Sequence, residues 1–113
     1  MSIKIDRIAS NIVKEISYIL ANEVKDNDIK FLTVTDAKVT NDLSFAKIYF
    51  TVLDENRKKE TLQALKNASG FIRRELADRV DIRHIPELEF VYDDSIAYGK
   101  KIENIIEQIH EEN

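Results

Sequence analysis

In residues 43–53, LSFAKIYFTVL, an apolar side chain recurs at every second position. The repeating positions are Ala46, Ile48, Phe50 and Val52. A period of two predicts a strand with one packed face, and such a strand requires both a partner strand and a covering layer. Residues 30–40, KFLTVTDAKVT, are rich in β-branched types, and TNDLS between the two segments favours a turn. We therefore expect an antiparallel hairpin.

Helical periodicity precedes and follows this hairpin. Apolar residues at steps of three and four predict a helix over about residues 4–25, and DENRKKE opens a second helix that runs to about residue 68. A further helix over 71–80 ends before a proline, because the residue preceding proline disfavours helix. LEFVY at 88–92 predicts a third strand, and Ile102 to Ile109 predict a closing helix.

The order of these elements is α-β-β-α-α-β, followed by α. Segregated helices and a small three-stranded sheet define an α+β layer structure. The third strand follows the hairpin through a long helical crossover, so it is able to pair in parallel. At 113 residues, the chain is expected to form one domain over residues 1–113.

The stretch NASGFIRR interrupts an otherwise helical segment. Asn67, Ser69 and Gly70 are poor residues for a helix interior. One interpretation is a plain corner, in which Gly70 ends one helix. The other is an anion site, in which the N–H groups and dipole of a new helix, with Arg73 and Arg74 beside them, face a phosphate. Gly70 would then allow close approach of the phosphate backbone.

Charge is unevenly distributed along a chain whose net charge is −4. Arg57 to Arg83 contain eight basic residues against four acidic ones, and Glu87 to Asn113 contain two against eight. The residues predicted to bind a nucleic-acid backbone are Lys66, Ala68, Ser69, Gly70, Arg73, Arg74, Arg79 and Arg83, with Arg7 and Lys47 as secondary candidates. Lys47 shares a strand face with Phe45 and Tyr49, which is either an aromatic-basic stacking surface or a partly covered sheet face.

The sequence lacks the residues that several classes of protein function require. There are no cysteines, and the only two glycines do not form a phosphate-binding loop. His84 and His110 lie 26 residues apart, without metal-ligand spacing, and Asp93–Asp94 suits helix capping better than a catalytic pair. We expect no enzymatic activity, no cofactor and no metal. No apolar run reaches the roughly 20 residues of a membrane helix, so we expect a cytoplasmic protein without membrane contact.

The element order with an interrupted helix resembles the type II KH fold, an RNA-binding fold that is normally broken by GxxG. The break at 68–70, ASG followed by FIRR, is similar to that of the ribosome-binding factor A family. RIASNIVKEISYIL resembles the opening helix of that family, and Asp42 and Leu43 match its hairpin. The likeness extends through Pro86 to the DSI motif that ends at Ile96. It covers nearly the whole chain.

This resemblance implies a type II KH-like domain with a C-terminal helix. It further implies a monomeric factor without catalytic activity that binds free or immature 30S subunits and contacts 16S rRNA. Such a factor supports 5′-end maturation of 16S rRNA and growth in the cold. The alternative is a protein-binding adaptor that has the same fold and does not contact RNA. Ser69 stands where the family often has a basic residue, so the arginines are expected to carry more of the affinity.

Overall fold

The computed structural model describes residues 3–29 and 32–94. The helices and strands are α1 (Ile3–Asn22), β1 (Leu32–Val39), β2 (Phe45–Val52), α2 (Lys58–Arg79) and β3 (Glu87–Tyr92). Two 3-10 turns, η1 (Asn27–Ile29) and η2 (Glu55–Arg57), precede β1 and α2. The predicted closing helix lies outside the described residues. Neither α1 nor α2 is long and apolar enough to cross a membrane.

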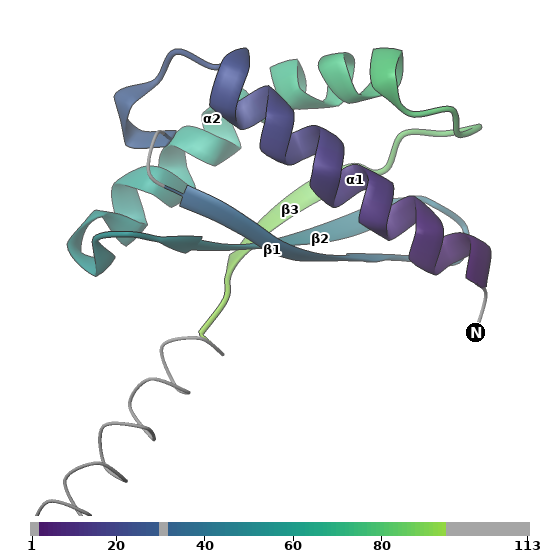
Figure 1. The fold of residues 1–113 in the computed structure, drawn as a ribbon, viewed down its shortest axis with the longest axis horizontal. Coiled ribbons are helices and arrows are strands. Elements are labelled where there is room, and N and C mark those ends of the chain that lie inside the picture. Colours follow the sequence, from purple (N-terminus) through teal and green to yellow (C-terminus); the bar gives the residue numbers. More distant parts are fainter. Residues whose placement is uncertain (1–2, 30–31, 95–113) are drawn as a thin grey trace, which may run out of the picture.

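The three strands form one sheet in the order β1-β2-β3. β1 pairs with β2 antiparallel, and β3 pairs with β2 in parallel, so α2 is the crossover that connects the parallel pair. Both helices lie on the same face of the sheet (Figure 1). The predicted α+β fold with a hairpin and a three-stranded mixed sheet is confirmed.

The core lies between the sheet and the two helices. The period-two residues Ala46, Ile48 and Phe50 of β2 are fully buried, which confirms the packed strand face. Ile12 and Ile16 of α1 are also fully buried. Burial of each large apolar side chain stabilises the fold by about 1.5–3 kcal/mol, so this layer supplies most of the driving force that positions the surface residues.

The predicted break in the second helical segment is wrong, because α2 is one continuous helix from Lys58 to Arg79. Leu65 and Ile72 are both fully buried and lie seven residues apart, which places them on one helix face two turns apart. Ser69 and Gly70 together disfavour a helix by about 1–1.5 kcal/mol, which is less than these two anchors contribute by burial. The N–H groups in the middle of a continuous helix bond to carbonyls one turn earlier. The free amides expected there are absent from α2.

A bend takes the place of the break. The hydroxyl of Ser69 donates to the carbonyl oxygen of Lys66 at 2.9 Å, within the same turn. Such back-bonding, and adjacent serine and glycine, are recognised causes of helix bending. In Figure 1, the ribbon of α2 changes direction along its length. The sequence signal was real, but it marks a change of direction and not a new helix.

Candidate nucleic-acid interface

The outward face of α2 carries a row of three basic side chains, Lys59, Lys66 and Arg74. Together with Gly70, which lies between the last two, they form what we call the basic stripe. All four residues are exposed. Their spacings of seven, four and four residues keep them on one side of a helix with about 3.6 residues per turn. Exposed Asp78, four residues after Arg74, continues this line at its C-terminal end, whereas Glu60 and Glu75 lie off it. Among the described residues, no ion pair within 4.0 Å involves the three stripe cations. The three cations of this stretch of the chain are therefore exposed and outnumber the one carboxylate on their line.

Gly70 lies in the middle of the basic stripe. A Cβ at this position would meet no atom within 4 Å, and the φ angle of Gly70 is not positive. Neither internal packing nor an unusual backbone conformation therefore requires glycine. Glycine in a helix interior costs about 0.5–1 kcal/mol relative to alanine. The uses that remain for it are the bend of α2 and the close approach of an external group.

The other two residues of the predicted break do not belong to the basic stripe. Ala68 is half-buried and packs against the core. Ser69 is also half-buried, and its hydroxyl is bonded within the helix. The local motif therefore presents only Gly70 to an external partner.

Arg73 is held inside the molecule by two backbone carbonyls. Its Nε donates to the carbonyl oxygen of Pro86 at 3.1 Å, and its Nη2 donates to that of Ile85 at 2.9 Å. These two bonds fasten the segment that leads into β3 to the side of α2. The adjacent Arg74 is exposed, so neighbouring arginines have different surroundings.

Arg79 is likewise engaged within the molecule. Its Nη2 lies 3.6 Å from both Glu23 and Glu75, and its Cζ lies 4.8 Å from the centre of the Tyr18 ring. These contacts tie the end of α2 to the C-terminal half of α1. Neither Arg73 nor Arg79 presents an unengaged guanidinium group to a partner.

Arg7 and Arg83 lie 76 residues apart in sequence and line the same hollow. This α1 hollow has a volume of about 1000 Å³ and is walled by the first turns of α1, the β1–β2 turn and the segment after α2. Lys4 also lines it. The structure therefore brings together three basic side chains from two distant segments.

Asp42 lines the α1 hollow from the β1–β2 turn. Its Oδ1 accepts hydrogen bonds from the hydroxyl groups of Ser44 and Thr40 and from the backbone N–H of Ser44. The bond from the Ser44 hydroxyl, followed by that from Thr40, lowers the pKa of Asp42 from 3.8 to about 2. The next residue, Leu43, has a φ of 61°, in the left-handed region. The turn is thus fixed by a charged side chain and carries backbone strain.

Lys47 lies on the sheet face that points away from the helices. Lys38 is its antiparallel partner, and Glu89 is its parallel partner on β3. The Nζ of Lys38 lies 5.7 Å from the centre of the Tyr49 ring, and Phe45 is 55% exposed. No element of 3–29 or 32–94 packs over this face. Lys47 is therefore separate from both the basic stripe and the α1 hollow.

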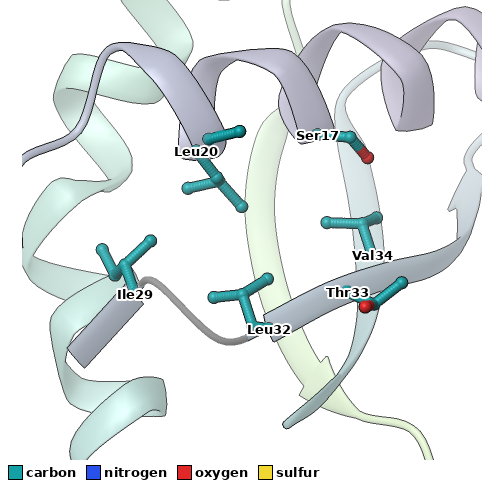
Figure 2. Close-up of a pocket in the computed structure, with 7 residues that line it drawn as sticks. Ser17, Leu20, Ile29, Leu32, Thr33 and Val34 are labelled. Carbon is teal, nitrogen blue, oxygen red and sulfur yellow. The ribbon is translucent and has the colours of Figure 1, made fainter. Parts of the chain in front are cut away.

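A second, smaller hollow of about 160 Å³ lies between α1, η1 and the start of β1 (Figure 2). Leu20, Ile29 and Val34 project toward it, and its lining includes no charged group among the described residues. Ser17 also lines it, but the hydroxyl of Ser17 donates to the carbonyl oxygen of Val13 at 2.7 Å. None of the predicted binding residues lines this hollow.

One cation of the basic stripe, Lys59, and one of the α1 hollow, Lys4, were absent from the residues predicted from the sequence. Lys59 lies seven residues before Lys66, and this two-turn spacing was already available within the helix that was predicted to run to about residue 68. Lys4 joins Arg7 and Arg83 only through tertiary packing. Sequence spacing does not place Lys4 near Arg83.

Comparison with known proteins finds similarity to one protein family over nearly the whole chain. A family model described as ribosome-binding factor A matches residues 4–106. The ribosome-binding factor A of Staphylococcus carnosus is 48% identical over 109 residues, covering 96% of this chain and 95% of that protein. That of Staphylococcus saprophyticus is 46% identical over 114 residues and covers both chains fully.

Solved structures agree with these matches. The crystal structure of ribosome-binding factor A from Thermus thermophilus superposes with a TM-score of 0.68 and 28% identity, covering 76% of this chain and 92% of that one. A homology model of the Thermus thermophilus protein, fitted into a cryo-EM map of its complex with 30S, gives a TM-score of 0.67 at 23% identity. It covers 80% of this chain and 96% of that one.

Proposed function

Because this chain belongs to the ribosome-binding factor A family, we propose that it is a small-subunit assembly factor that binds free or immature 30S particles through 16S rRNA. In this proposal, it supports late maturation, including that of the 16S rRNA 5′ end, and growth in the cold. It acts as a cytoplasmic monomer without catalysis of its own. The support for the partner is the family, whose Thermus thermophilus member was fitted into a map of a 30S complex.

The observation that carries this proposal is the basic stripe on α2. Three exposed cations in a row match the regular negative charge of an RNA backbone, and phosphate contacts supply most of the affinity in such complexes. Gly70 between them leaves the helix surface free of a side chain, so a phosphate or ribose is able to approach the main chain. In this proposal, side chains and not free helix amides hold the RNA.

The remaining predicted residues divide by their surroundings. Arg7 and Arg83 extend the RNA surface at the α1 hollow. Arg73 and Arg79 hold the fold together, so they support the surface indirectly. Lys47 stays a secondary candidate on the other sheet face. A binder with this surface promotes maturation by stabilising one rRNA arrangement over others, because it shifts a population only through its differential affinity.

The test is cosedimentation of the full chain with 30S particles. Lys66→Glu combined with Arg74→Glu reverses two stripe charges without touching the core, and we expect loss of cosedimentation with unchanged thermal unfolding. Lys14→Glu with Lys25→Glu, exposed positions outside the stripe and the α1 hollow, makes the same change in net charge. This control should bind like the unaltered protein.

Cells that carry only the stripe variant are expected to accumulate 16S precursor RNA. Retained 30S binding by the stripe variant would refute the proposed RNA surface. It would instead favour an adaptor that uses another part of the molecule and touches no RNA.

A further inference from the structure

We propose that the α1 hollow binds one unpaired nucleotide of RNA, with Arg7 and Arg83 holding its phosphate and the base lying on the apolar floor. This inference rests on the proposed function, since it states what one part of the RNA surface takes. It adds a site for a single base to a surface that otherwise reads only the backbone.

The rim of the α1 hollow selects an anion. Lys4, Arg7 and Arg83 are all exposed around it, and among the described residues no ion pair within 4.0 Å involves any of them. Two carboxylates, Asp42 and Asp81, also line the hollow. Asp42 is already bonded to three donors of its own turn. Three cations against two carboxylates leave the lining with a net charge of +1, and none of the cations is held by a carboxylate within 4.0 Å among the described residues. They are left for a ligand, and guanidinium groups suit phosphate oxygens geometrically.

The floor of the hollow suits a base. Ile8 and Val80 are each 8% exposed, and Leu43 and Ile82 are half-buried beside them. Together they form an apolar surface beneath the charged rim. Covering it removes apolar area from water, which favours a flat, weakly hydrated group. A volume of about 1000 Å³ is at the upper end of the ligand-pocket range of roughly 300–1000 Å³.

Two side-chain amides in the lining favour an unpaired nucleotide over a duplex backbone as the occupant. Asn11 and Asn41 line the hollow, and each offers both donors and an acceptor to the edge of a base. A duplex presents its phosphates on a convex surface and keeps its bases stacked, so it would contact the rim and leave the floor open. Bases in loops and single strands are able to leave the stack and fill such a site.

The first experiment compares two probes on the full, isotope-labelled chain by NMR titration. Adenosine monophosphate should shift the amide signals of Asn11, Asn41 and Ile82. Ribose 5-phosphate carries the phosphate without a base, and burial of the base should make the monophosphate bind about fivefold more tightly or better. Equal affinities, or shifts confined to the basic stripe, would overturn the inference.

The second experiment tests the source of the nucleotide and the residues that hold it. A short single-stranded oligoadenylate should displace the monophosphate, and a blunt RNA duplex should not. Arg7→Gln with Arg83→Gln should lose nucleotide binding, whereas Lys14→Gln with Lys25→Gln should retain it. Displacement by the duplex, or retained binding in the arginine variant, would contradict the proposed site.

Parallel cosedimentation with 30S particles separates this inference from the proposed function. An unaltered protein that fails to bind 30S refutes the proposed function, whatever the nucleotide does. An unaltered protein that binds 30S but shows no nucleotide shifts overturns only the nucleotide site. If the arginine variant then loses 30S binding, the hollow contacts a backbone or a protein of the particle instead.

Discussion

At the scale of single residues, Asp42 fixes the β1–β2 turn through a carboxylate whose pKa is lowered to about 2. A folded-state pKa below the usual 3.8 means that the charge stabilises the fold above that pH. The contribution is lost as the pH falls toward 2. Asp42→Asn should therefore lower the melting temperature at neutral pH, and the gap should narrow as acid is added. Thermal unfolding across this pH range measures the difference in melting temperature between the two proteins. A difference that stays constant with pH would contradict the role assigned to the Asp42 carboxylate.

Gly70→Ala should separate stability from binding. The added methyl group meets no atom of the protein, so we expect a gain of about 0.5–1 kcal/mol in the free energy of unfolding. Close approach of RNA predicts weaker 30S binding by the same variant. Ala77→Gly, at another exposed position of α2, should lose a similar amount of stability and serves as the control. A destabilised Gly70→Ala would show that the bend requires glycine, and unchanged binding would show that RNA keeps its distance.

At the scale of elements, the sequence predicted what periodicity controls. The alternation in β2 and the three- and four-residue steps in α1 gave the correct elements, because a buried face must repeat with the period of its element. The break in α2 was wrong because Ser69 and Gly70 were judged by local propensity. The spacing of Leu65 and Ile72, which tertiary packing enforces, carried more free energy and was the better guide.

Arg73 and Arg74 allow a test of which arginine stabilises the fold and which one binds the partner. Arg73→Gln removes two charge-assisted bonds to the carbonyls of Ile85 and Pro86. We expect a loss of about 1–3 kcal/mol in the free energy of unfolding, with 30S binding retained below the melting temperature. Arg74→Gln should change stability by less than about 0.5 kcal/mol and weaken binding. Chemical denaturation and cosedimentation measure the two quantities, and the reverse pattern would exchange the roles of the two residues.

At the scale of the whole molecule, the fold gathers charge that the sequence disperses. Lys66 and Arg74 were both chosen from the sequence, but their common face depends on the continuous helix that replaces the expected break, in which they lie about two turns apart. The meeting of Arg7 with Arg83 was not predicted, since it depends on how the end of α2 packs beside the start of α1. Their common site comes from the tertiary structure.

In the proposed function, this gathering of basic side chains lets a chain with a net charge of −4 bind a polyanion, and salt titration tests that proposal. Neutralising about four phosphates on single-stranded RNA predicts a log–log slope of affinity against salt of roughly −3. Lys66→Gln with Arg74→Gln should make that slope shallower by about 1.4. The variant makes two fewer phosphate contacts, and each contact on a single strand contributes about 0.7 to the slope through counterion release. Lys14→Gln with Lys25→Gln should leave it unchanged. An RNA affinity of the unaltered protein that does not change with salt would indicate an apolar adaptor interface. A steep dependence on salt would suit an assembly factor, because competing ions then readily reduce its affinity.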